Sequence, residues 1–224
     1  MDIQPLHSWD LTRAEARALQ RQLADRVDQR QPLTGCDLIA GADVSYNRSS
    51  NILYAGVVVL RMDDLTIVEK RGVACEVTFP YVTGLLSFRE TPALLKVFAQ
   101  IETKPDAVIV DGHGYSHPRR FGFACHVGLW LNLPSVGCAK TRLIGTYKEP
   151  GRRAGSVTPL KAKDEVVGQV VRTKTGVKPV FVSVGYKIDL RSAVELVLAT
   201  CRGYRLPEPT RQAHLHVNTL RRQA

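Results

Sequence analysis

Hydrophobic and polar positions alternate along the chain in blocks that predict a mixed α/β fold. In the N-terminal third, three apolar runs rich in β-branched residues are separated by turn residues, which predicts consecutive antiparallel strands. These runs are Leu38–Tyr46, Leu53–Leu60 and Thr66–Val77. The next segments alternate between helical and strand patterns, which favours parallel strands joined by a crossover helix. They are a helix at Ser87–Ile101, a strand at Asp106–Asp111, a helix at Phe121–Asn132 and a strand at Pro134–Cys138.

The segments before and after this central region predict further elements around the sheet. The segment Thr12–Val27 has an amphipathic helical pattern, with a capping box at its start. Later elements are strands at Val166–Thr173 and Pro179–Val184, a helix from Asp189 or Ser192 to Cys201, a rigid connector at Leu206–Pro209 and a last helix from Thr210. No linker or repeat interrupts the pattern, so we expect residues 1–224 to form a single α/β domain. Its mixed sheet would be an antiparallel three-strand meander extended by parallel strands and flanked by helices.

Charge narrows the choice of partner. The chain has 31 Lys and Arg against 21 Asp and Glu, a net charge of +10, and its pI is about 9.6. Residues 140–191 alone carry twelve basic and four acidic residues. This balance favours nucleic acid before an acidic membrane surface, although a merely soluble basic protein fits the charge equally well. The strongly apolar amphipathic helix typical of a membrane-surface protein is absent from the pattern.

The cysteines and the N-terminal residues indicate a reducing compartment. The chain has five cysteines without a CxxC pair, and most lie in apolar runs, which favours reduced packing residues over a zinc site or a catalytic thiol. The first residues show no basic region followed by an apolar one, and no apolar run approaches the ~20 residues that span a bilayer. We therefore expect a cytoplasmic protein with no membrane partner. We also expect a monomer, since no apolar surface helix requires a partner.

Three carboxylates stand out by their positions. Asp43 interrupts the first apolar strand, Glu90 lies at a helix entrance, and Asp111 ends a buried strand. The predicted topology places the first and fourth strands side by side, which would bring Asp43 and Asp111 together. Two close carboxylates ionise cheaply only around a cation, and oxygen ligands of this kind favour Mg²⁺ or Mn²⁺ and phosphoryl transfer. Separate carboxylates that cap helices or pair with arginines explain the spacing equally well.

Basic side chains accompany these carboxylates. Lys140 follows the fifth strand and could neutralise a phosphate, although a solvated surface lysine is the more common explanation. His214 could orient a water or act as an acid or base, and a helix-surface histidine is an equally good explanation. The glycine-rich stretch after the fourth strand holds His117, Arg119 and Arg120, which could contact phosphates.

The loop before the second predicted helix suggests contact with a base. An aromatic residue on a rigid loop beside a phosphate site can stack on a base or wedge into a base step, and Tyr81, between Pro80 and Val82, has that placement. A core aromatic cluster is the better explanation when this segment is considered alone. Nearby glycines could let the backbone close around a flat base, although a turn is the usual explanation for each. They are Gly84, Gly114 and Gly122.

Five motifs occur in an order typical of one family. They are Gly41-Ala-Asp-Val-Ser-Tyr46, Pro80-Tyr-Val-Thr-Gly-Leu-Leu-Ser-Phe-Arg-Glu90, Asp111-Gly-His-Gly-Tyr-Ser-His-Pro-Arg-Arg-Phe-Gly122, Val136-Gly-Cys-Ala-Lys140 and Pro209-Thr-Arg-Gln-Ala-His214. Together they resemble the endonuclease V family, over essentially the full chain. The resemblance implies a ribonuclease H-like fold and a Mg²⁺-dependent DNA repair endonuclease, with Mn²⁺ as a substitute, that acts at deoxyinosine, the product of adenine deamination. Members hydrolyse the second phosphodiester bond 3′ of the lesion and leave 3′-hydroxyl and 5′-phosphate ends.

The same resemblance implies roles for individual residues. The acidic triad corresponds to Asp43, Glu90 and Asp111, with Asp43 and Asp111 on the metal. Positions that assist at the phosphate correspond to Lys140 and His214. The wedge that fills the gap left by the turned-out base corresponds to Tyr81 within Pro80–Val82. The hypoxanthine pocket would be lined by Gly84, Leu86, Gly114 and Gly122.

Two alternative functions stand beside the one that the resemblance implies, and the chain differs from many relatives at one residue of the wedge loop. Some relatives cut inosine-containing RNA, so a ribonuclease is the nearest alternative. A non-catalytic nucleic-acid-binding module is disfavoured because all three carboxylates are present. Many relatives have proline where this chain has Thr83, so we expect a less rigid wedge loop.

Overall fold

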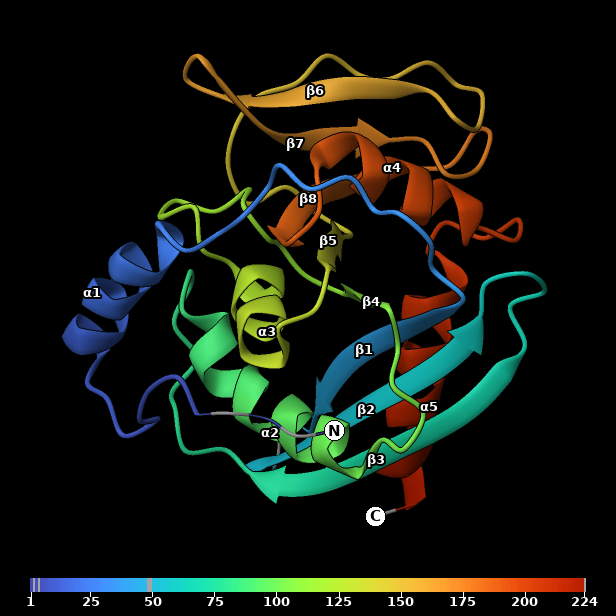
Figure 1. Cartoon of the computed structure of the whole chain (residues 1–224). Helices are drawn as coiled ribbons and strands as arrows, with labels where there is room; N and C mark the ends of the chain where they lie inside the picture. The colour runs from blue at the N-terminus through green and yellow to red at the C-terminus, as the bar shows by residue number, and fades with distance from the viewer. Residues whose placement is uncertain (2, 4, 48–49, 224) are drawn as a thin grey trace.

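The computed structural model describes residues 1, 3, 5–47 and 50–223, and these residues form one eight-stranded sheet with five helices (Figure 1). The strands are β1 (Leu38–Tyr46), β2 (Ile52–Arg61), β3 (Ile67–Glu76), β4 (Ala107–Val110), β5 (Ser135–Ala139), β6 (Val157–Ala162), β7 (Glu165–Val171) and β8 (Val180–Tyr186). The helices are α1 (Arg13–Ala24), α2 (Leu86–Gln100), α3 (Phe123–Leu131), α4 (Leu190–Ala199) and α5 (Glu208–Gln223).

The sheet combines antiparallel and parallel pairs. Its strand order is β3-β2-β1-β4-β5-β8-β7-β6, and the parallel pairs are β1–β4 and β4–β5. This arrangement confirms the predicted meander extended by parallel strands. Ala42 of β1 pairs with Val110 of β4, so Asp43 and Asp111, the next residue of each segment, lie beside one another. The strand order therefore brings the two acids together, as the sequence predicted.

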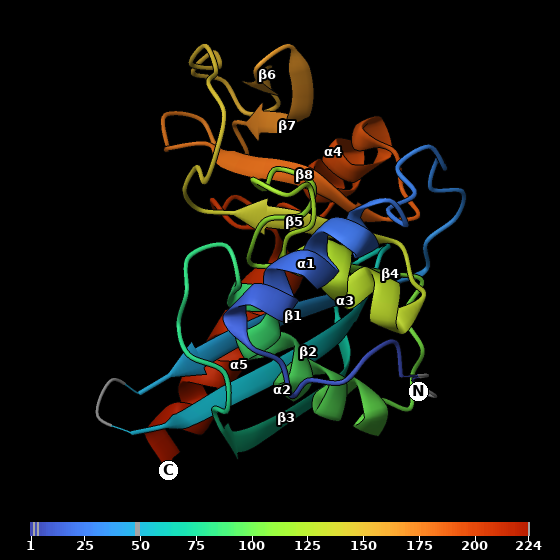
Figure 2. The same cartoon turned by 90° about the vertical axis from the view of Figure 1, so that its left-hand side faces the viewer.

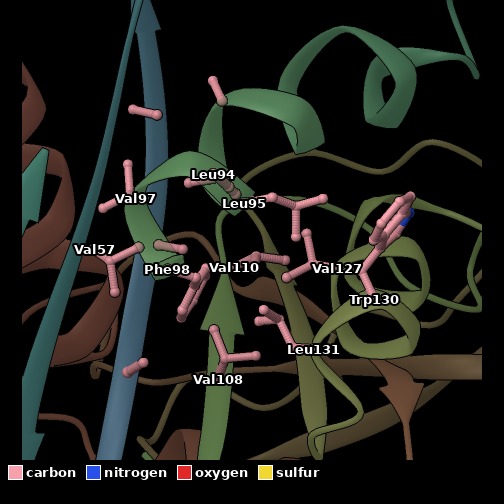
Figure 3. Packing of buried hydrophobic residues seen from close by; sticks show 14 of the residues in the cluster. Val57, Leu94, Leu95, Val97, Phe98, Val108, Val110, Val127, Trp130 and Leu131 are labelled. Atoms are coloured by element: carbon pink, nitrogen blue, oxygen red, sulfur yellow. The ribbon is translucent and has the colours of Figure 1, made fainter. Parts of the chain in front are cut away.

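Helices cover both faces of the sheet (Figures 1 and 2). On one face, Val108 and Val110 of β4 pack among side chains of α2 and α3, including Phe98 (Figure 3). On the other face, Ile109 packs in a cluster with Val197 of α4 and with α5. Successive strand side chains point to opposite faces, so a central strand that is covered on both sides is apolar at every position. This explains why the central strands appear in the sequence as continuous apolar runs.

One strand was not predicted from the sequence, and the last helix begins earlier than expected. The strand β6 has no counterpart in the predicted pattern, because it lies at the sheet edge and Leu160 is its one buried residue. It also holds Pro159, which an edge strand tolerates and a central strand excludes. The last helix begins at Glu208 and not at Thr210. Pro209 fits the first turn, since its missing N–H has no bond to make there.

The caps of two helices and the state of the cysteines agree with the predictions from the sequence. The capping box at α1 is present, with Glu15 Oε2 accepting a hydrogen bond from the Thr12 N–H at 2.7 Å. Asp189 caps α4 by accepting from the Ser192 N–H at 2.6 Å. All five cysteines are free thiols. Among the described residues, no helix combines the length and the apolar character that crossing a membrane requires.

Candidate active site

Three side chains from distant parts of the chain meet beside the carboxyl end of β4. Asp43 belongs to β1, Asp111 follows β4, and His214 belongs to α5. Their potential ligand atoms all lie within 4.8 Å of one another. Asp43 and Asp111 are close because β1 pairs with β4. His214 lies beside them because α5 packs across β1. We call this group the acidic cluster.

Both ring nitrogens of His214 have partners. Nδ1 lies 2.8 Å from Asp43 Oδ2, and Nε2 lies 3.0 Å from Asn218 Nδ2. An ionised carboxylate only accepts hydrogen bonds, so we assign the proton to Nδ1, and the Asn218 amide donates to Nε2. His214 therefore keeps one tautomer and orients Asp43. The sequence alone did not single out Asn218. The feature that could have identified it is its spacing of four residues from His214, which places both on the same face of α5.

Lys140 lies at the end of β5 and contacts the acidic cluster. Its Nζ donates a hydrogen bond to Asp111 Oδ2, with which it forms an ion pair. The side chain remains 37% exposed, so the ammonium faces both the carboxylate and solvent. The alternative of an isolated surface lysine does not describe this residue.

Negative charge around the acidic cluster exceeds what its surroundings balance. Glu90 on α2 is only 6% exposed, and burial, followed by the charge of Asp43, raises its pKa to about 8. Burial and Asp43 also raise the pKa of Asp111, although Lys140 opposes this shift. A divalent cation would relieve the repulsion, and two carboxylates with a third nearby are a donor set that a hard cation prefers. The residues present therefore fit such a metal.

A pocket of about 220 Å³ adjoins the acidic cluster. Gly112 and Thr141, the sequence neighbours of Asp111 and Lys140, lie in its wall. Pockets for drug-sized ligands occupy about 300–1,000 Å³, so this one suits a single flat group. Of the residues expected around a base, three line it: Gly84, Leu86 and Gly122.

Gly114 has a different place from the one expected. It is not part of the pocket wall; a Cβ at this position would lie 2.0 Å from the Val184 carbonyl oxygen. Its N–H donates to Ser183 Oγ at 2.9 Å. Gly114 thus lets the loop after β4 pack directly on β8, and it affects the pocket only through the position of that loop.

The loop before α2 presents Tyr81 at the rim of the pocket. Tyr81 is 63% exposed, whereas Phe79 is buried and packs on Phe88 with ring centroids 5.7 Å apart. The alternative of a core aromatic cluster therefore holds for Phe79 and is wrong for Tyr81. Val82 lines the pocket next to Tyr81, and Pro80 is exposed beside them.

The loop after β4 carries three expected phosphate contacts, His117, Arg119 and Arg120, and the first of them is buried. The His117 ring is buried, with Nε2 3.0 Å from the Gly84 carbonyl and Nδ1 accepting from the Arg119 N–H at 3.2 Å. Burial lowers its pKa to about 4, so the ring is neutral. The expected phosphate contact is corrected for His117, because its ring does not face solvent. Arg119 and Arg120 are half-buried, donate to Gly84 and Glu165 respectively, and stay candidates for phosphate contact.

Gln20 of α1 is a supporting residue that sequence reasoning missed. Its Nε2 donates to the carbonyls of Gly84 and Phe121 at 3.0 and 2.9 Å, and its Oε1 accepts from Arg119 Nε at 2.6 Å. One buried amide therefore ties α1 to both loops that wall the pocket. Its signal in the sequence is a polar residue on the inward face of an amphipathic helix.

Comparison with known proteins identifies the family. The family model for endonuclease V matches residues 19–215. The chain belongs to the endonuclease V family. A curated endonuclease V from Gloeobacter violaceus is 50% identical over 220 residues, which are 97% of this chain and 89% of that protein.

Solved endonuclease V structures share the fold. The protein from Streptomyces avermitilis is 40% identical, with a TM-score of 0.92 and coverage of 96% of both chains. Endonuclease V from Ciona intestinalis, in complex with a 24mer DNA containing an inosine followed by a ribo-adenosine, is 27% identical, with a TM-score of 0.83. That match covers 94% of this chain and 98% of the other. The chain therefore has the ribonuclease H-like fold that its motifs implied and belongs to a family of nucleases.

Proposed function

We propose that the protein is a divalent-metal-dependent endonuclease that hydrolyses the second phosphodiester bond 3′ of a deoxyinosine in DNA. The products would carry 3′-hydroxyl and 5′-phosphate ends, and the role would be repair of deaminated adenine. The observation that carries the proposal is the acidic cluster of Asp43, Asp111 and His214 beside a small pocket with an exposed tyrosine at its rim. The Ciona intestinalis relative, solved with inosine-containing DNA, supports inosine as the recognised base.

Asp43 and Asp111 would hold Mg²⁺, with Mn²⁺ as a substitute, and Glu90 would complete the acidic triad. The raised pKa values of Glu90 and Asp111 support this assignment, because burial, followed by the charge of Asp43, disfavours the ionised form of each carboxyl group. When bound, the metal polarises the scissile phosphate and makes a water more acidic. His214 contributes by holding Asp43 in one orientation through its Nδ1–H.

Lys140 acts on the phosphate from the protein side. Its ammonium contacts Asp111 and is also open to solvent, so it can approach a phosphate bound over the acidic cluster. There it would neutralise the negative charge that develops on the phosphate oxygens during hydrolysis. Arg119 and Arg120, from the loop after β4, would contact neighbouring phosphates.

The small pocket would receive the lesion base. Its volume of about 220 Å³ suits a planar hypoxanthine, and Gly84, Leu86 and Gly122 line it. Backbone donors and acceptors can distinguish the O6 acceptor and N1 donor of hypoxanthine from adenine, which presents the opposite pattern. Tyr81 at the rim would fill the gap that the turned-out base leaves in the stack.

A cleavage panel tests the proposal. Matched DNA and RNA strands, each with and without one inosine, are incubated with wild-type and Asp43→Ala protein in Mg²⁺, Mn²⁺ or EDTA. We expect a metal-dependent nick in inosine-containing DNA, and no nick by Asp43→Ala protein whose circular dichroism matches the wild type. Full activity of that variant would end the metal assignment. Preferred cleavage of the inosine-containing RNA would favour the ribonuclease alternative.

Tyr81→Ala tests lesion recognition separately from hydrolysis. Stacking of an aromatic side chain on a base contributes about 1–3 kcal/mol, so we expect affinity for inosine-containing DNA to fall by roughly 5- to 150-fold. The metal dependence of the remaining activity should not change. Undiminished binding by Tyr81→Ala would remove Tyr81 from the wedge role.

A further inference from the structure

A second hollow, of about 740 Å³, lies next to the acidic cluster, and we call it the basic groove. Its lining residues include Lys140, Arg142, Tyr147, Lys178, Phe181 and Arg205. Lys140 also contacts Asp111, and Arg142 also lines the small pocket. The groove therefore adjoins both the acidic cluster and the small pocket, and its volume is more than three times that of the pocket.

Positive charge dominates this groove. Four of its nine lining residues are cations, and of these Arg142 and Lys178 are exposed. Glu149 is the acidic residue in the lining, and it forms an ion pair with Arg172 at 2.7 Å. Its negative charge is therefore compensated by a buried arginine. A hollow lined by one sign of charge attracts a polyanion.

Two arginines, half-buried Arg205 and buried Arg172, hold the groove walls in place. Arg205 Nη2 donates to the carbonyls of Lys140 and Pro179 at 2.5 and 2.8 Å, which joins the end of β5 to the start of β8. Arg172 donates to the carbonyls of Gly151 and Val177 at 3.0 and 2.5 Å, which joins the segment after Glu149 to the segment before Lys178. Walls that are fixed before binding lose little conformational entropy when a ligand arrives.

Arg142 occupies the boundary between the groove and the small pocket. Its guanidinium lies over the Tyr147 ring, 5.8 Å from the centroid, and Tyr147 packs edge-on against Phe181 at 5.4 Å. Stacking on an aromatic ring limits the positions that this exposed side chain adopts. A guanidinium held in this way is suited to paired hydrogen bonds with a phosphate.

We propose that the basic groove binds the sugar–phosphate backbone of the lesion-bearing DNA strand beside the turned-out nucleotide, with Arg142 and Lys178 as phosphate contacts. The identity of the strand rests on the proposed function, because a base in the small pocket and a phosphate at Asp111 bring the adjoining backbone to Arg142 and Lys140. The charge and shape of the groove support nucleic-acid binding independently of inosine. Arg142 and Lys178 thus add affinity, whereas Lys140, which also lines the groove, acts at the scissile phosphate.

The salt dependence of binding tests this assignment. Fluorescence anisotropy measures the affinity of full-length protein for a labelled inosine-containing duplex in EDTA, from roughly 50 to 200 mM KCl. Loss of two phosphate contacts should make the slope of log K against log[KCl] shallower by about 1.4–1.8 in Arg142→Ala/Lys178→Ala protein. Lys70→Ala/Lys96→Ala is the matched control, since it removes the same charge from exposed positions on β3 and α2. The control should keep the wild-type slope.

The possible outcomes separate the groove from the proposed function. A wild-type slope in the Arg142→Ala/Lys178→Ala variant, with an unchanged melting temperature, would overturn the groove. A shallower slope in a protein that fails to cut inosine-containing DNA would support the groove and end the proposed function. A shallower slope on RNA alone would overturn DNA as the ligand.

Discussion

Gly41 of β1 lies so close to Pro209 of α5 that a Cβ at residue 41 would stand 1.9 Å from the Pro209 carbonyl oxygen. This contact lets the first turn of α5 rest directly on the strand. His214 lies on the same helix and hydrogen-bonds Asp43 on the same strand. The missing side chain at Gly41 therefore helps to set the distance between the two residues of the acidic cluster that come from different ends of the chain.

We expect Gly41→Ala to lower the free energy of unfolding by roughly 1–3 kcal/mol, because backbone cannot move aside as a flexible side chain can. Its DNA cleavage rate should fall further than its folded fraction, since α5 carries His214 away from Asp43. Denaturant titration and single-turnover cleavage measure the two effects. Gly151→Ala is the control: its nearest neighbour is Ser156 Oγ at 3.0 Å, the end of a flexible side chain. Wild-type stability of Gly41→Ala would contradict the argument.

Asn218 should act on catalysis through His214. Asn218→Ala removes the amide that donates to His214 Nε2, so the ring can change its tautomer and its orientation toward Asp43. Loss of a partner of this kind typically costs about 10–100-fold, and we expect that loss in the single-turnover rate with DNA affinity unchanged. Thr219→Ala, at the exposed neighbouring position, serves as the control. Equal losses in rate and affinity would point to a general disturbance of α5.

Lys140→Met should separate phosphate stabilisation from metal binding. The substitution removes the cation that contacts Asp111, so the affinity of the acidic cluster for Mg²⁺ should be kept or increased. The cleavage rate should still fall by about 10²–10³-fold, as expected for a lost electrostatic contact to the phosphate. Thermal shift in an Mg²⁺ titration measures the first effect and single-turnover cleavage the second. Weaker metal binding would show instead that Lys140 supports the metal site.

Glu90 should make the metal-free protein less stable as the pH rises. Its pKa is about 8 in the folded protein, against 4.5 for an unperturbed glutamate side chain, so folding favours the protonated form. The resulting stabilisation is fully present below pH 4.5 and is lost as the pH rises through about 8. In EDTA, Glu90→Gln should therefore melt at a higher temperature than the wild type near pH 9, with the difference shrinking toward about pH 5.

Two comparisons sharpen this measurement of Glu90. Mg²⁺ should raise the melting temperature of the wild type near pH 9, because a cation stabilises the ionised carboxylates. The control Glu76→Gln removes an exposed carboxylate at the end of β3 and should leave the pH dependence of melting unchanged. Superimposable melting curves for wild type and Glu90→Gln across this pH range would contradict the account.

The pairing of Asp43 with Asp111 was predictable from the sequence, because strand order follows from element order. Hairpin-forming strands lie next to one another, and a crossover helix returns the chain to a parallel neighbour. Buried central strands and helix caps are visible in the same way, as local patterns of residue types. The edge strand β6 escaped this reasoning, since its exposed side chains leave no apolar run.

The sequence by itself therefore determined the family motifs, the order of the elements and the meeting of Asp43 with Asp111. Only the tertiary structure decided which neighbours serve the site. In the folded protein, His117 is buried against Gly84, Gly114 lets the loop after β4 pack on β8, and Asn218 hydrogen-bonds His214. Motif spacing records which residues are close along the chain. Whether a side chain faces a pocket, a backbone carbonyl or solvent depends on contacts between segments that are distant in sequence.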